Sequence, residues 1–241
     1  MSFAPCLIVP VYNHAEAFVQ AIRQFPPEIP LIIVDDGNNA EQAAILAEMA
    51  KIHRAELIRL PENSGKWAAV LAGLRRAWEL SFTHIIQVDA DGQHNYSDIP
   101  KFFALSKDQP GAMLLGVPKY GDDIPASRRF GRHIANFFMR LETGDWTLKD
   151  AMCGFRLYPL KELKPLIDKG LVFQRMGGDI EFLVKAKWLG VPHLNIETSV
   201  IYPVGGVSNF RMLQDNIELI YLNTYLCTLA FFRLFRFRRN K

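Results

Sequence analysis

The feature that most constrains the fold is a series of short apolar segments, each closed by polar residues. Such segments occupy residues 6–11, 31–34 and 84–88, and residues 56–60 and 112–117 are also strand-like. Unbroken apolar runs of this length are typical of strands buried on both faces of a sheet. Between them, residues 16–25, 40–52 and 66–80 have the composition and spacing of helices. This alternation predicts an α/β fold, with a mostly parallel sheet and helices on both faces.

The regular alternation ends near residue 120. Beyond it, residues 127–141 and 179–189 are predicted helices, and residues 191–202 are predicted to be extended. The 241 residues contain no low-complexity linker and no repeat, and 49% of them are hydrophobic, enough to bury a core. We therefore expect one domain over residues 1–215 and a separate tail over residues 216–241.

Charge and cysteine content exclude some classes of protein. The net charge of +3 is too balanced to indicate nucleic-acid binding. The three cysteines, Cys6, Cys153 and Cys227, are odd in number, far apart and without the spacing of metal ligands. They favour a reduced, cytosolic setting, and no secretory signal is visible at the N-terminus.

The segment Asp89-Ala-Asp-Gly-Gln-His94 follows the apolar run that ends at Val88. Carboxylates at i and i+2 of an extended segment point to the same side, and at the carboxyl end of a strand they face the crevice where open α/β sheets bind ligands. Such a pair can hold one hard divalent cation, while Gly92 permits a sharp turn and the Gln93 carbonyl or His94 completes the shell. The alternative is a solvated loop with an Asp that caps the next helix.

Similar polar motifs stand at other strand ends. Pro10-Val-Tyr-Asn13 closes the first strand, Asp35-Asp-Gly37 closes the second, and Asn63-Ser-Gly-Lys66 precedes the third helix. In this order the motifs resemble those of the family-2 glycosyltransferases of GT-A fold. Within that family, the segment 89–94 looks like the branch that uses polyprenyl phosphate. The resemblance continues through Arg128-Arg129 and residues 150–158.

The resemblance implies a GT-A, Rossmann-like sheet, with residues 1–120 as the nucleotide-sugar half and residues 121–215 as the acceptor half. It also implies an enzyme, a hexosyltransferase that is inverting and metal-dependent. The donor would be a nucleoside-diphosphate sugar and the acceptor a polyprenyl phosphate, dolichyl or undecaprenyl. Positioning and electrostatics, without a covalent enzyme intermediate, would carry the rate.

The donor site needs a slot for the base and a hydrogen-bond acceptor for the base or ribose. Tyr12 can flank the base and Pro10 shapes the turn, with Asn13 at the same strand end. Asp35 or Asp36 can accept from the base imide or a ribose hydroxyl, and the resemblance assigns both to the donor pocket. The alternatives are an aromatic residue packed in the core and a polar Asp-Asp-Gly turn.

The diphosphate needs charge compensation. Lys66 opens a helix, so its ammonium and the nearby backbone amides could face phosphate, although a helix cap with an exposed lysine explains the motif too. Asp89 would contact the donor, and a metal at Asp89 and Asp91 would act as a Lewis acid on the leaving group. The resemblance adds Gln93 as a third ligand. Oxygen ligands suit Mg²⁺ or Mn²⁺.

Three arginines, Arg128, Arg129 and Arg132, lie at the start of the predicted helix 127–141. Arg128 and Arg132 share a face, and guanidinium groups match phosphate oxygens bidentately. The resemblance implies that arginines here receive the lipid phosphate and that Asp150 lies at the acceptor end. A solvated basic helix end, which would include Arg129, is the alternative.

Residues 202–211 contain a Gly-Gly pair followed by polar residues. A hinged loop that closes over the diphosphate has this composition, with Ser208 and Arg211 as its ligands. An ordinary Gly-Gly turn is the alternative.

The candidates for a catalytic base are Asp179 and Glu181. A phosphate monoester has a second pKa of about 6 and is largely dianionic at neutral pH, so such an acceptor needs little help from a base. Asp179 could also cap its helix. An acceptor with a sugar hydroxyl on a glycolipid or glycan would need a true base and is the second hypothesis. A non-catalytic nucleotide-sugar-binding membrane scaffold is the third.

The tail, residues 216–241, is amphipathic and basic, with five arginines and lysines in its last nine residues. Glu218, Asn223 and Arg233 interrupt its apolar run, so we expect it to fall short of the roughly 20 apolar residues that span a bilayer. Aromatic residues between arginines suit a helix lying on anionic lipid, on the cytoplasmic face of a membrane. A core helix is the alternative, and a separate membrane-protein partner remains open.

Overall fold

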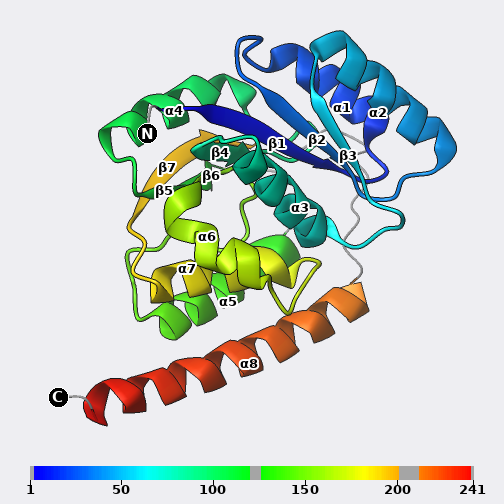
Figure 1. Cartoon of the computed structure of the whole chain (residues 1–241). Coiled ribbons are helices and arrows are strands. Elements are labelled where there is room, and N and C mark those ends of the chain that lie inside the picture. The colour runs from blue at the N-terminus through cyan, green and yellow to red at the C-terminus, as the bar shows by residue number, and fades with distance from the viewer. Residues whose placement is uncertain (1–2, 120–125, 201–211, 240–241) are drawn as a thin grey trace.

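A computed structural model of the protein describes residues 3–119, 126–200 and 212–239, with the side chains of 126–128, 212–213 and 235–239 excepted. Its centre is a sheet with the strand order β3-β2-β1-β4-β6-β5-β7 (Figure 1). The strands are β1 (Pro5–Val11), β2 (Leu31–Asp35), β3 (Glu56–Arg59), β4 (His84–Gln87), β5 (Met113–Lys119), β6 (Arg156–Pro159) and β7 (His193–Ser199). All run in one direction except β6, which is antiparallel to both β4 and β5. The predicted α/β class and mostly parallel sheet are confirmed.

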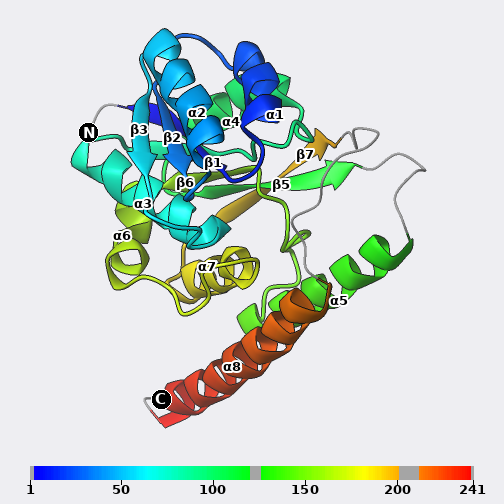
Figure 2. The same ribbon diagram turned by 90° about the vertical axis from the view of Figure 1, so that its right-hand side faces the viewer.

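Helices cover both faces of this sheet (Figures 1 and 2). They are α1 (Ala15–Ala21), α2 (Ala40–His53), α3 (Lys66–Glu79), α4 (Ile99–Asp108), α5 (Ala126–Thr143), α6 (Leu160–Lys169), α7 (Gly177–Trp188) and α8 (Met212–Arg239). Two buried clusters result. In β1, Cys6 and Ile8 face the cluster under α3, α6 and α7, whereas Leu7 and Val9 face the cluster under α1, α2 and α4. The alternate residues of a strand point to opposite faces, so every position of β1 must be apolar.

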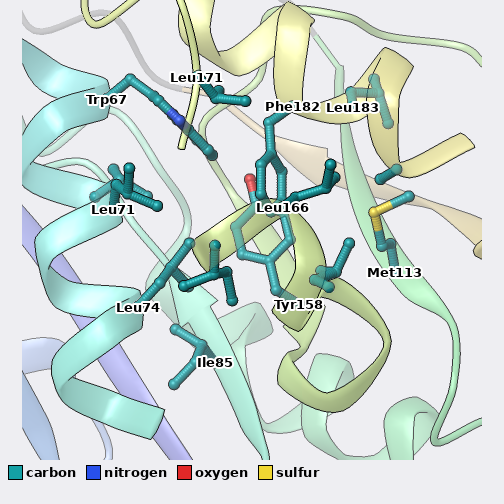
Figure 3. Packing of buried hydrophobic residues seen from close by; sticks show 14 of the residues in the cluster. Trp67, Leu71, Leu74, Ile85, Met113, Tyr158, Leu166, Leu171, Phe182 and Leu183 are labelled. Carbon is teal, nitrogen blue, oxygen red and sulfur yellow. The ribbon is translucent and has the colours of Figure 1, made fainter. Parts of the chain in front are cut away.

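Aromatic packing fixes the start of α3 against α7. The Trp67 ring lies 4.8 Å from the ring of Phe182 and 6.4 Å from that of Tyr158, and all three side chains are almost fully buried (Figure 3). A Cβ on Gly178 would lie 2.3 Å from the Trp67 Cβ, so only glycine allows this approach. The helix that begins with Lys66 is therefore held rigidly at its N-terminal end.

Several element boundaries differ from the sequence-based prediction. The first predicted helix divides into α1 and a short 3₁₀ turn, Ile22–Gln24, and the helix predicted from residue 179 begins at Gly177. The elements α4, β6 and α6 were not predicted. Their sequence signals are weak, because α4 has a proline in its first turn, α6 contains Pro165 and β6 begins with an arginine.

Helix α8 packs along α5 and α7, with Leu222 and Leu226 completely buried (Figure 2). The sequence-based expectation that the tail is too short to span a membrane was wrong. By length and composition, the 21 residues Gln214–Leu234 could cross a membrane. Only 11% of the most apolar part of this segment is buried against the rest of the protein.

Candidate active site

The predicted donor and metal residues that the structure describes gather at the carboxyl ends of β1, β2 and β4. This edge also receives the N-terminal ends of α3 and α7. Parallel strands bring their following loops to one edge, where open α/β sheets bind ligands. The turn before β6 lies at the same edge because β6 runs in the opposite direction.

The centre of the site is a three-residue ionic cluster. The Lys66 ammonium lies 2.8 and 3.0 Å from the two carboxylate oxygens of Asp89 and 3.5 Å from Oδ2 of Asp179. Burial disfavours the charged form of Lys66, but Asp179 and Asp89 outweigh it and raise the lysine pKa. Burial likewise opposes ionisation of Asp89, but Lys66 and His94 lower its pKa below the ordinary value. Lys66 and Asp89 are therefore both charged at neutral pH.

The rest of the motif surrounds Asp89. His94 Nε2 lies 3.4 Å from Asp89 Oδ2, and the Tyr96 hydroxyl donates to the Asp89 carbonyl at 2.9 Å. The backbone amide of Gln93 donates to the Asp91 carboxylate at 3.0 Å. This bond folds the loop back on itself at Gly92, which has a positive φ. Burial, and then the charge of Asp89, raise the pKa of the Asp91 carboxyl. A cation placed between Asp89 and Asp91 would relieve that repulsion.

A glycine that the sequence did not reveal as functional lies directly against Asp89. A Cβ on Gly154 would stand 2.4 Å from Oδ2 and 2.7 Å from Oδ1 of that carboxylate. The register of β4 with β6 explains the approach, since Gln87 pairs with Arg156 and two further residues on each strand bring Asp89 opposite Gly154. Any side chain at position 154 would push the carboxylate away.

Asp35 is buried and holds the end of β2 to the end of β1. Its Oδ1 accepts from both the amide and the side chain of Asn38, each at 2.8 Å, and Arg59 lies 3.6 Å from its Oδ2. Asn38 also donates to the Val11 carbonyl and accepts from the Asn13 amide, both at 2.8 Å. Asn38 was missed in the sequence because Asn13 and Val11, which it joins to Asp35, are distant in the chain.

Asp36 holds the loop before α3. It accepts from the Ser64 amide at 2.8 Å, the Gly65 amide at 3.1 Å and the Asn63 side chain at 3.3 Å. Burial raises its pKa, against the effect of these amides. The Trp67 and Ala68 amides donate to the Gln174 carbonyl. The amides of this helix start that were predicted to face phosphate are thus bonded within the protein, and Lys66 alone keeps that prediction open.

Two further donor residues lie beside this network. Pro10 pairs with Val34 in the sheet, and Tyr12 follows the end of β1 with a half-buried side chain. Asn13 adopts a positive φ of 58°, which turns the chain away from the strand into α1. Asparagine tolerates this conformation better than most residues.

Among the residues predicted to bind the acceptor, Arg132 and Asp150 form an ion pair at 3.2 Å. The other Asp150 oxygen accepts from the Met152 and Cys153 amides, which fixes the turn that leads to Gly154. Arg128 belongs to the first turn of α5, but its side chain lies outside the described residues, and Arg129 is exposed. Ser208 and Arg211 lie outside the described residues, although His94 pairs with Val200 just before that segment.

The two candidate bases occupy different surroundings. Asp179 is 3% exposed beside Lys66, and its Oδ1 has no hydrogen-bond partner among the described residues. Glu181 is completely buried away from this cluster, where it accepts from the Val172 and Phe173 amides and pairs with Lys185. The structure therefore brings Asp179 to the site and places Glu181 in a network that supports the preceding loop.

Arg156 is a buried arginine that the sequence did not identify as functional. Its guanidinium donates to the carbonyls of Asp179 at 2.8 Å and Ala151 at 2.6 Å. It thus links β6 to the start of α7 and to the turn after Asp150. An arginine inside a strand gave no signal of this role without knowledge of its partners.

The donor set suits a hard divalent cation, although among the described residues no three His, Cys, Asp or Glu side chains are grouped as a metal site. Asp89, Asp91 and Asp179 supply carboxylate oxygens at one edge, and the buried Asp179 Oδ1 has no hydrogen-bond donor there. Oxygen ligands of this type bind Mg²⁺ and Mn²⁺. The carboxylates of Asp89 and Asp91 would suit such an ion, provided that the Lys66 ammonium moves away from Asp89.

The protein-family model described as Glycosyl transferase family 2 matches residues 6–164. The chain belongs to this family. The family-2 enzyme is 30% identical to an uncharacterised protein of Methanocaldococcus jannaschii over 172 aligned residues. The aligned residues make up 66% of this chain and 73% of that protein. The predicted resemblance to glycosyltransferases is confirmed.

Two named relatives act on lipid phosphates. The UDP-N-acetylglucosamine–dolichyl-phosphate N-acetylglucosaminyltransferase of Methanococcus voltae is 25% identical over 182 residues, 68% of this chain and 72% of that protein. The undecaprenyl-phosphate 4-deoxy-4-formamido-L-arabinose transferase of Pseudomonas fluorescens is 27% identical over 161 residues, 63% of this chain. The match spans only 46% of that transferase's length.

Solved structures show the same fold. Glucosyl-3-phosphoglycerate synthase of Mycobacterium tuberculosis, crystallised with Mn²⁺, UDP and its product, superposes with a TM-score of 0.65 at 16% identity, covering 93% of this chain and 77% of that one. S. aureus TarS with UDP-GlcNAc gives a TM-score of 0.58 at 15% identity, covering 83% and 60%. This family-2 glycosyltransferase therefore has the predicted GT-A fold.

Proposed function

We propose that this family-2 glycosyltransferase moves a sugar from a nucleoside diphosphate to a polyprenyl phosphate, with inversion at the anomeric carbon. The observation that carries the proposal is the Lys66–Asp89–Asp179 cluster at the edge of the sheet, with the Arg132–Asp150 pair on the acceptor side. Residues 1–120 would bind the donor and residues 121–215 the acceptor. The lipid-phosphate relatives support this choice of acceptor.

On the donor side, Tyr12 and Pro10 would flank the base, and Asp35 and Asp36 would shape the base and ribose pocket with Asn13. Both aspartates hold backbone turns, so their main contribution is a rigid pocket wall. Asp89, Asp91 and Gln93 would hold Mg²⁺ or Mn²⁺, which neutralises the leaving diphosphate when bound. The Lys66 ammonium would bind a phosphate oxygen.

On the acceptor side, Arg132 would orient the lipid phosphate together with Arg128, Ser208 and Arg211. A phosphate dianion is already a nucleophile at neutral pH, since its second pKa is about 6. Asp150 holds Arg132 in place, and Asp179 would stand beside the reacting centre without having to take a proton. Alignment of the phosphate oxygen with the anomeric carbon would then supply much of the rate.

A sugar hydroxyl as acceptor is the second candidate. One observation favours it, because Asp179 presents a buried carboxylate oxygen without a hydrogen-bond donor among the described residues. Such an oxygen could accept a proton from a hydroxyl. The two acceptors differ in how strongly turnover depends on Asp179.

Transfer assays with the full-length protein test the function. Purified protein is incubated with UDP- and GDP-sugars and with undecaprenyl or dolichyl phosphate, and lipid products are identified by mass spectrometry. We expect a glycolipid whose formation is abolished by a chelator and by Asp91→Ala, but not by Asp108→Ala at the exposed end of α4. No lipid product with any donor, or product unaffected by Asp91→Ala, contradicts the proposal.

We further propose that α8 docks the enzyme on the cytoplasmic face of a membrane. The helix exposes large apolar side chains opposite its buried stripe, namely Ile217, Ile220, Tyr221, Phe231, Phe232 and Leu234. The neighbouring α5 adds a second exposed stripe at helical spacing, Phe130, Ile134, Phe137 and Leu141. Contiguous apolar surface of this kind marks a membrane or protein interaction site.

Sedimentation with vesicles of phosphatidylglycerol and phosphatidylcholine tests docking. We expect the protein to bind these vesicles, and Ile220→Glu with Phe232→Glu to release it. Ile52→Glu on α2 is the matched control, because Ile52 is 59% exposed on a distant helix. Binding unchanged by the α8 substitutions, or no binding to vesicles without a membrane-protein partner, contradicts direct docking through α8.

A further inference from the structure

The Lys66 ammonium occupies the position that a bound cation would need. It lies within 3.0 Å of both carboxylate oxygens of Asp89 and 3.5 Å from Asp179 Oδ2. A divalent ion of the Mg²⁺ class binds carboxylate oxygens at about 2.0–2.1 Å. The ammonium and the ion would therefore compete for the same oxygen atoms of Asp89.

The backbone of Lys66 is not free to withdraw. The residue begins α3, whose next two amides are bonded to the Gln174 carbonyl and whose Trp67 ring is completely buried. Only the side chain can move, by rotation about its own bonds. The Lys66 side chain is 24% exposed, so an ammonium displaced from Asp89 is only partly hydrated and is stabilised by another anion nearby.

The donor diphosphate is the anion that would meet this need. It approaches the same sheet edge and brings negative charge within reach of a lysine at the start of α3. Asp179 keeps a second carboxylate near the ammonium while Asp89 is released.

We infer that Lys66 is an internal counter-ion that keeps the Asp89 cation site closed until a nucleoside diphosphate arrives. Cation and donor then bind cooperatively, since each favours the conformation in which Lys66 has left Asp89. Without the donor, the cation must displace the ammonium unaided and binds weakly. The inference rests on the proposed cation site and adds the order in which the site is filled.

Reciprocity makes the role of Lys66 measurable without turnover. If the nucleotide strengthens cation binding by some factor, the cation must strengthen nucleotide binding by the same factor. Removing the ammonium removes the competition for Asp89, so the cation should bind more tightly alone and gain less from the nucleotide. A lysine with only a structural role would produce no such change in coupling.

The experiment measures Mn²⁺ binding to the full-length protein by electron paramagnetic resonance, with and without UDP or GDP. In the wild type we expect the nucleotide to tighten Mn²⁺ binding at least tenfold. In Lys66→Met we expect Mn²⁺ alone to bind at least about tenfold more tightly than in the wild type, with most of the nucleotide effect lost. Lys161→Met, an exposed lysine on α6, changes the net charge equally and should behave as the wild type.

A second variant and a folding measurement show whether any change in Mn²⁺ binding comes from misfolding. Lys66→Gln should reproduce Lys66→Met, and circular dichroism reports whether both are folded. Without metal, both variants should melt at a lower temperature than the wild type, and Mn²⁺ should restore more stability to them than to the wild type. This follows because Asp89 and Asp179 lose their shared counter-ion.

Each remaining outcome is decisive. Tight Mn²⁺ binding to the wild type without nucleotide, unchanged in the variants, overturns the role of Lys66 but leaves the cation site intact. Absence of Mn²⁺ binding in all proteins, even with nucleotide, overturns both the inference and the metal part of the proposed function.

Discussion

A methyl group added at Gly154 is the sharpest test of how the site is built. In Gly154→Ala the new Cβ would lie 2.4 and 2.7 Å from the Asp89 carboxylate oxygens, whereas ordinary contacts begin at 3.4 Å. The carboxylate must therefore retreat by roughly 1 Å, since the new Cβ is attached directly to the backbone of a fixed turn and cannot itself move aside. It cannot do so and keep both Lys66 at 2.8–3.0 Å and His94 at 3.4 Å.

The magnitude follows from this displacement. A misplacement of about 1 Å in a reacting constellation can cost about 100-fold in rate, or about 2.7 kcal/mol of transition-state stabilisation. Overpacking a tight site costs about 1–3 kcal/mol of folding stability. We expect kcat/KM to fall about 100-fold while the protein stays folded, because Gly154 has no positive φ and alanine adds no backbone strain.

The assay compares Gly154→Ala with Gly111→Ala, whose Cβ would meet only Glu162 Oε1 at 3.8 Å. Both variants are measured for glycolipid formation, for Mn²⁺ and UDP binding by calorimetry, and for melting temperature. The control should match the wild type in all three. If Gly154→Ala keeps kcat/KM within threefold of the wild type, catalysis does not depend on the close approach of the Asp89 carboxylate to Gly154.

Four further substitutions separate stability from catalysis. Burial raises the pKa of Glu142 to about 8 from an ordinary 4.5, so the wild type should lose about 4 kcal/mol of stability as pH rises from 5 to 9. Glu142→Gln should remove this slope in thermal melts, and an equal slope in both proteins contradicts the assignment. Asp36→Asn should cost about 2 kcal/mol of stability and weaken UDP binding in calorimetry, because it disturbs three hydrogen bonds to the loop before α3. Glu181→Gln should lower the melting temperature and leave kcat near the wild-type value. A large loss of kcat would instead show that Glu181 contributes to catalysis. Asp179→Asn should reduce kcat at least about 100-fold with a hydroxyl acceptor but far less with a phosphate acceptor, measured at saturating donor.

The central strands, and the edge of the sheet at which the site lies, could be predicted from the sequence. Apolar runs such as residues 31–34 are buried on both faces and need no knowledge of tertiary contacts to be recognised. The strand β6 could not be found in this way. It begins with Arg156, whose burial is possible only because the Asp179 and Ala151 carbonyls accept its hydrogen bonds. A buried charge with distant partners looks like a surface residue in the sequence.

The same limit applies to the site. Asp89 was predicted from its place after a strand, because local order alone fixes which way it points. Asn38, Gly154 and Arg156 act on residues far away in the chain, and no local pattern reports those contacts. The sequence also could not distinguish Asp179 from Glu181 as the residue at the site. The two carboxylates are separated by one residue on a helix and therefore face different surroundings.

The reversed strand explains how donor and acceptor sides come together. Each parallel strand delivers to the site edge the residues that follow it, as β4 delivers Asp89. Because β6 runs the other way between β4 and β5, it delivers the residues that precede it, the turn with Asp150 and Gly154. Asp150 in turn fixes Arg132 on α5. One antiparallel strand thus sets an acceptor-side turn against the donor-side carboxylate, with Arg156 anchoring that turn to the helix of Asp179. The position of the Asp150–Gly154 turn relative to Asp89 is therefore governed by the register of β4 with β6.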